Sequence, residues 1–108
     1  MAQFDVHRNP GRNRREIPYL VVVQSAWFDD TPRRLVVPLL LMDTAQALRP
    51  PPHMPRFVIE GRAVLLDPLQ CQAVPRGLLG PALASLADDD SASRIIAAID
   101  EVITRAHG

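Results

Sequence analysis

The chain has 108 residues, of which 47% are hydrophobic and 22% charged, which suits one folded domain spanning residues 1–108. Twelve arginines are balanced by twelve acidic residues, and lysine is absent. Nucleic-acid-binding domains usually carry a basic excess, so this balance argues against direct nucleic-acid binding.

The first half of the chain predicts three β-strands. Residues 3–7 alternate in the strand manner, and residues 19–24 and 33–40 are rich in β-branched and aliphatic side chains. The segment 8–18 is predicted to be a loop because it contains Pro10-Gly11. Pro38 lacks an N–H for a ladder, so the third strand is expected to be an edge strand or to bulge there.

The second half predicts shorter elements. Residues 43–49 favour a short helix that ends before three consecutive prolines. Strands are expected at 56–60 and 62–66, joined by a tight turn around Gly61. A further short strand is expected at 70–74.

The C-terminal helix gives the clearest pattern. Apolar residues recur at positions 95, 96, 99, 102, 103 and 106, which is typical of an amphipathic helix. Asp90 or Ser91 is the expected N-cap. With about five or six strands before it, this helix predicts a small, strand-dominated α+β fold.

The residues that usually carry catalysis or metal binding are scattered. His7, His53 and His107 are far apart in the sequence and are expected on the surface or in loops. Cys71 has no disulfide partner, which fits a reducing, cytoplasmic compartment, and it is expected to be buried and inert. We therefore predict no catalytic residues, no metal site and no cofactor, and so no enzymatic activity.

Two features between the second predicted strand and the start of the third could bind a partner. Arg33 and Arg34 could clamp a phosphate, but neighbouring strand residues point to opposite faces, which favours only one of them facing any ligand. Trp27 and Phe28 either anchor a protein interface or close one end of the core, and both readings remain open.

Several stretches of the chain resemble the CcdB family of toxins from plasmid and chromosomal toxin–antitoxin systems. The resemblance runs nearly end to end and in the same order. The stretches that carry it are Gln3-Phe4, Val23-Gln24-Ser25, Asp30-Thr31-Pro32, residues 33–39, Val74-Pro75 and residues 95–100.

This resemblance implies a small antiparallel barrel of the type shared with MazF toxins, a C-terminal helix and a homodimer. It also implies binding to the DNA gyrase A subunit, stabilisation of the gyrase–cleaved DNA complex, and neutralisation by a CcdA-like antitoxin. Apolar surface from residues 21–23 and 35–41, in excess of what one helix covers, is the further reason to expect a dimer. The gyrase-binding residues that it implies are Phe4, Ser25, Trp27, Phe28, Asp100, Ile103 and Thr104.

A basic loop is the expected antitoxin site. Arg8, Arg12, Arg14 and Arg15 lie close together in the sequence, and an acidic, disordered antitoxin tail would fold on binding to them. The alternative is that these arginines form a solvated surface.

The C-terminus leaves the activity open. The best-known member of the family ends in Trp-Gly-Ile, residues that carry gyrase poisoning there, whereas the corresponding positions here read Thr104-Arg105-Ala106. Two alternatives to a gyrase poison therefore remain. One is a relative that binds antitoxin without poisoning gyrase, and the other is a MazF-like endoribonuclease, against which the missing pair of Arg and general base argues.

Overall fold

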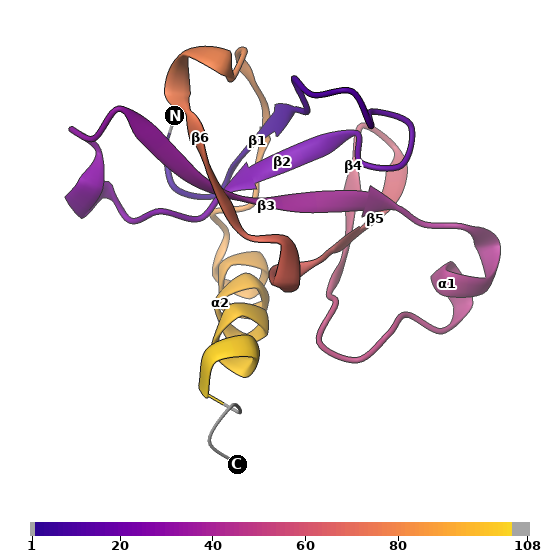
Figure 1. The fold of residues 1–108 in the computed structure, drawn as a ribbon. Coiled ribbons are helices and arrows are strands. Elements are labelled where there is room, and N and C mark those ends of the chain that lie inside the picture. The colour runs from indigo at the N-terminus through magenta and orange to yellow at the C-terminus, as the bar shows by residue number, and fades with distance from the viewer. Residues whose placement is uncertain (1, 105–108) are drawn as a thin grey trace.

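The computed structural model describes residues 2–104, without the side chains of Thr44, Gln46 and Thr104 (Figure 1). Its strands are β1 Asp5–Arg8, β2 Tyr19–Val22, β3 Arg33–Leu41, β4 Arg56–Ile59, β5 Arg62–Leu66, β6 Gln72–Pro75 and β7 Ala82–Ser85. Its helices are α1 Thr44–Leu48 and α2 Asp89–Thr104, with 3-10 turns η1 Ala26–Phe28, η2 Pro68–Gln70 and η3 Arg76–Leu78.

The strands form one curled antiparallel sheet, a half-barrel, in the order β4-β5-β3-β2-β1-β7, with β6 also paired to β3. The strand-dominated α+β prediction is thus confirmed. The described part of the chain has seven strands, more than the sequence predicted. The strand that was missed, β7, reads Ala-Leu-Ala-Ser, a sequence of weak strand propensity. It is ordered because it pairs with β1.

The main core lies between one face of the sheet and α2. It contains Val21, Val37 and Leu39 from the sheet and Ile95 and Ala98 from the helix. A second, smaller cluster of Leu20, Val22, Val36 and Leu79 covers part of the other face. Most of residues 21–23 and 35–41 are buried within the chain, so the apolar surface that these runs leave exposed is smaller than expected and lies mainly at Leu35 and Leu41.

Pro38 lies inside the sheet and not at its edge. Residues 33–36 of β3 pair with β6 on one side, and residues 39–41 pair with β5. Pro38 falls between these two ladders, and its carbonyl accepts a hydrogen bond from the Asp67 N–H at 3.1 Å. The prediction of an edge strand or a bulge is therefore wrong, because a change of neighbouring strand removes the need for the missing donor.

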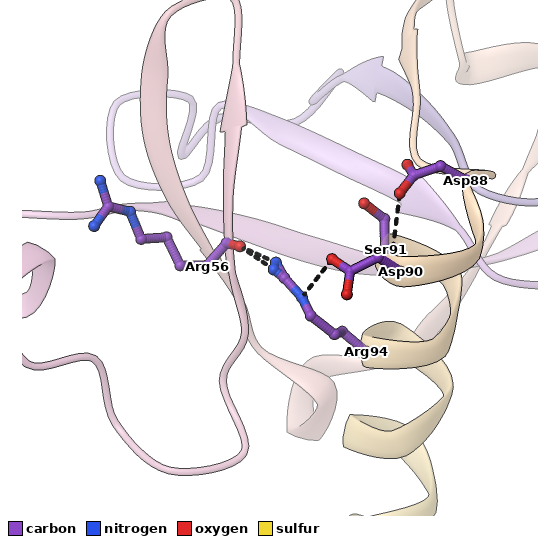
Figure 2. A network of polar contacts seen from close by, with 5 residues as sticks. All are labelled: Arg56, Asp88, Asp90, Ser91 and Arg94. Carbon is purple, nitrogen blue, oxygen red and sulfur yellow. Dashed lines mark hydrogen bonds and ion pairs between the residues drawn. The ribbon is translucent and has the colours of Figure 1, made fainter.

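The start of α2 is fixed by a carboxylate that the sequence analysis did not choose. The Asp88 side chain accepts a hydrogen bond from the Ser91 N–H at 3.0 Å (Figure 2). Asp88 is therefore the N-cap in place of Asp90 or Ser91. Four residues after Asp90, Arg94 pairs with it at 3.7 Å and donates a hydrogen bond to the Arg56 carbonyl at 2.9 Å. This arginine thus connects α2 to β4.

The cap makes the stability of α2 depend on pH. The hydrogen bonds from Ser91 lower the pKa of Asp88, so the cap stabilises the folded state above the unfolded pKa. This contribution is lost as the pH falls through the lower folded value. We expect Asp88→Ala to lower the melting temperature at pH 7 but not at the acid end of the titration. Asp88→Asn, which keeps an acceptor, should stay close to wild type at pH 7. A melting temperature of Asp88→Ala equal to wild type at pH 7 would contradict this role.

Candidate partner-binding surface

Two large aromatic side chains protrude beside the turn between β2 and β3. Trp27 is 87% exposed and Phe28 is 54% exposed, and both belong to the 3-10 turn η1. The sequence left open whether these rings close one end of the core or anchor an interface. Their exposure excludes the first of these two readings. Exposed rings of this size bury much area on binding at small entropy cost, so this turn is a candidate partner surface.

Polar side chains hold the segment that carries these rings. The Gln24 amide donates to the Phe28 carbonyl at 2.9 Å, and its oxygen accepts from the Leu35 N–H at 3.2 Å. The Thr31 hydroxyl lies 2.9 Å from the Phe28 carbonyl and 3.0 Å from the Arg33 carbonyl. The aromatic pair is consequently part of a hydrogen-bonded loop.

The two neighbouring arginines of β3 point in different directions. Arg33 is exposed, whereas Arg34 is only 5% exposed. The Arg34 guanidinium donates hydrogen bonds to the carbonyls of the same loop. The prediction that only one of them can face a ligand is confirmed, and the pair does not form a two-arginine phosphate clamp.

The last turns of α2 present a second set of predicted residues. Asp100 is exposed and Ile103 is 65% exposed, whereas Ile99 packs against the main core. Thr104 ends the helix, and its side chain lies outside the described residues, as do the positions that follow it. Those following positions are Arg105, Ala106, His107 and Gly108.

The remaining two predicted gyrase-binding residues, Phe4 and Ser25, are less exposed than the aromatic pair of η1. Phe4 has a positive φ of 70° and a ring that is 8% exposed within the main core. Ser25 is half-buried at the N-cap position of η1. In this conformation Phe4 supports the sheet from inside, and Ser25 connects β2 to the aromatic turn.

The exposed residues fall into two separate groups on one chain. Figure 1 shows η1 at one end of the curled sheet, while α2 projects away from the sheet toward the C-terminus. Trp27 and Phe28 are thus together, and Asp100 and Ile103 are together, but the structure does not bring the two groups to one patch within a single protomer.

The basic loop after β1 is folded on itself. The Asn9 amide donates to the Ile17 carbonyl at 2.8 Å, which closes the loop. Arg14 donates to the Gly11 carbonyl at 2.8 Å, and Arg8 lies 3.8 Å from Glu60. The side chains of all four arginines of this loop are exposed: Arg8, Arg12, Arg14 and Arg15. Arg12 and Arg15 have no contact among the described residues that fixes their guanidinium groups.

His53 is exposed in a loop, as the sequence predicted, and His107 lies outside the described residues, but His7 and Cys71 do not lie where the sequence placed them. His7 is buried, and its Nδ1 lies 2.8 Å from the Gly80 carbonyl, so the expectation of a surface histidine is wrong for it. Cys71 is exposed, which contradicts the predicted burial. Desolvation nevertheless raises the pKa of the Cys71 thiol, so it stays protonated at neutral pH. Within residues 2–104, no group of three or more potential ligands could hold a metal ion.

A pocket of about 230 Å³ lies between the proline-rich loop and α2. Its lining includes His53 and Glu101, whose side chains are 3.7 Å apart, together with Pro68 and Val102. The sequence analysis did not anticipate this pocket, because the contact between the loop and the helix is made across the fold. Neither of the two exposed groups described above lines it.

Comparison with known proteins gives one result. The family profile described as CcdB protein matches residues 3–105, which span nearly the whole chain and both groups of exposed residues. No curated protein gives a significant match. None of the helices within residues 2–104 is long and apolar enough to cross a membrane.

Proposed function

Because the chain belongs to the CcdB family of toxins from toxin–antitoxin systems, we propose that it binds the A subunit of DNA gyrase and stabilises the gyrase–cleaved DNA complex. The observation that supports this proposal best is the exposed Trp27–Phe28 pair on a hydrogen-bonded loop. In this proposal the toxin acts in the cytoplasm as a single-domain protein, requires no cofactor and catalyses no reaction.

The side chains of the two exposed groups are suited to binding a protein surface and not DNA. The rings of Trp27 and Phe28 provide apolar area, and Asp100 and Ile103 provide a carboxylate and a second apolar contact. Ser25 precedes the aromatic turn, Phe4 packs in the main core beneath the sheet, and Thr104 ends the helix that carries the second group. A group of contacts that favours the cleaved state shifts the cleavage equilibrium toward broken DNA.

The direct test uses purified toxin with gyrase holoenzyme and supercoiled plasmid. We expect linear DNA to accumulate when detergent and protease are added, in proportion to the toxin concentration. A standard quinolone poison serves as the positive control. If no linear DNA appears, the relative that binds antitoxin without poisoning gyrase becomes the better hypothesis. If RNA is cut in the absence of gyrase, the endoribonuclease alternative is correct.

The protein is proposed to act as a homodimer. The outward apolar residues Ile96 on α2 and Leu35 on β3 remain exposed in the single chain and are available to a second copy. We expect a dimer in sedimentation at micromolar concentration, and we expect Leu35→Glu to shift the protein toward monomer, because a charge would be buried in the interface. A wild-type protein that sediments as a monomer at that concentration would contradict the dimer.

The basic loop is the proposed site for a CcdA-like antitoxin with an acidic tail. We expect the double change Arg12→Ala with Arg15→Ala to reduce antitoxin affinity about tenfold at low salt, and the reduction to shrink as salt screens the charges. Arg14 is left in place because it holds the loop backbone, and Arg8 because it contacts Glu60. Arg76→Ala, an exposed arginine elsewhere, is the matched control. Equal affinities for the double variant and wild type at low salt would reject this site.

A further inference from the structure

Arg34 occupies an unusual place for a charged residue. It alternates with Val36 along β3, so both side chains point to the same face of the sheet, and its cross-strand partner on β6 is Val74. Both valines belong to the smaller apolar cluster. An aliphatic side chain would satisfy packing there, and burying a guanidinium is unfavourable unless hydrogen bonds compensate.

Hydrogen bonds compensate the two terminal nitrogens, and all of them go to the loop that carries the aromatic pair, whereas the buried Nε has no hydrogen-bond partner among the described residues. One terminal nitrogen of Arg34 donates to the Thr31 carbonyl at 2.9 Å and to the Arg33 carbonyl at 3.0 Å. The other terminal nitrogen donates to the Asp29 carbonyl at 2.8 Å. Asp29 directly follows Phe28 in the chain. One planar group therefore fixes both sides of the loop at once.

Two further polar residues of the loop add to the fixation. Gln24 and Thr31 both contact the Phe28 carbonyl, so the backbone of the aromatic turn is held directly as well as through its neighbour. The Trp27 and Phe28 rings themselves remain exposed. The interactions thus restrict the backbone of the loop while leaving the rings free to contact a partner.

We propose that Arg34 is a positioning residue for the partner-binding surface: it holds the aromatic loop in its binding conformation before the partner arrives. A loop fixed in advance loses less conformational entropy on binding, which raises affinity without any new contact. The identity of the partner rests on the proposed function, but the fixation of the loop does not.

The first experiment uses the single tryptophan of the chain as its own reporter in the free protein. Time-resolved anisotropy of Trp27 should show the amplitude of the sub-nanosecond motion rising about twofold in Arg34→Met. Arg33→Met, the neighbouring exposed arginine, should match wild type. Arg34→Lys keeps the charge but lacks the planar fork that reaches both sides of the loop, so its amplitude should be intermediate.

A second variant keeps the proposal testable if Arg34→Met does not fold. Thr31→Val removes the hydroxyl that contacts the Phe28 and Arg33 carbonyls of the same loop without changing a buried charge, and it should also raise the mobility of Trp27. If folded Arg34→Met and Thr31→Val both show wild-type anisotropy and only a lower melting temperature, the proposal is wrong and the arginine merely stabilises the sheet.

The second experiment measures trapping of cleaved DNA with gyrase holoenzyme and plasmid. Arg34→Met should need about tenfold more protein than wild type for half-maximal trapping, with Arg33→Met within about twofold. Trapping by Arg34→Met at the wild-type concentration would overturn the link to binding. If wild-type protein traps nothing, the proposed function fails, while the anisotropy still decides whether Arg34 fixes the loop.

Discussion

Trp27→Ala is expected to raise the toxin concentration needed for half-maximal DNA trapping by about 30-fold or more, the effect of losing a hot-spot residue of about 2 kcal/mol. The melting temperature should remain close to that of wild type, because the ring is 87% exposed and its loss leaves no cavity. A gyrase cleavage titration and a thermal melt of the same preparation measure the two quantities.

The control for this change is another exposed apolar side chain. Leu48 on α1 is 83% exposed and lies at the far end of the molecule from η1 (Figure 1), so Leu48→Ala should trap DNA as wild type does. Removal of residues 105–108 is expected to weaken trapping only in part. If that truncation abolishes trapping while Trp27→Ala is silent, the contact lies in the C-terminal residues and the aromatic pair is not the anchor.

Ile95→Ala is expected to lower the free energy of unfolding by about 3 kcal/mol, because truncating a fully buried side chain leaves a cavity. Ile95 is 0% exposed and is the residue of α2 that enters the main core most completely. Its neighbour Ile96 is 49% exposed, so Ile96→Ala should cost less than about 1 kcal/mol. Urea unfolding of the two variants measures the difference.

The same pair of variants tests how α2 presents its exposed residues. Since Asp100 and Ile103 follow Ile95 on the same helix, loosening the helix should weaken any contact that they make. Equal losses of stability for Ile95→Ala and Ile96→Ala would mean that α2 does not dock on the sheet as described. Both measurements should be made at one protein concentration, because dimerisation adds to apparent stability.

Patterns local in sequence predicted much of the fold. The stripe of apolar residues identified α2, and the tight turn around Gly61 is confirmed by positive φ angles of 53° at Glu60 and 75° at Gly61. Pairing across the sheet was not predictable in the same way. β7 is a strand because β1 lies beside it, and Pro38 is tolerated because β3 changes neighbours there. Both depend on contacts between residues distant in sequence.

The candidate surface was likewise predictable only in part. The sequence identified Trp27 and Phe28, since adjacent large rings beside a turn are uncommon, but it could not decide whether they were buried. It also could not show that Phe4 enters the core, because this depends on a positive φ that a phenylalanine rarely adopts. The role of Arg34 was hidden for a similar reason: its partners are backbone carbonyls, which every residue has.

The position of Pro38 also bears on how the chain avoids aggregation. The segment Leu-Val-Val-Pro-Leu-Leu-Leu at 35–41 is strongly apolar and uncharged, and such a segment, exposed in a chain that is still folding, can stack with the same segment of other chains as cross-β structure. Proline cannot donate to such a stack and so interrupts it. In the finished sheet, the carbonyl of Pro38 is satisfied by Asp67, and no ladder to β5 or β6 reaches that residue. The proline thus protects the most aggregation-prone strand at the place where the native sheet does not need its hydrogen bond.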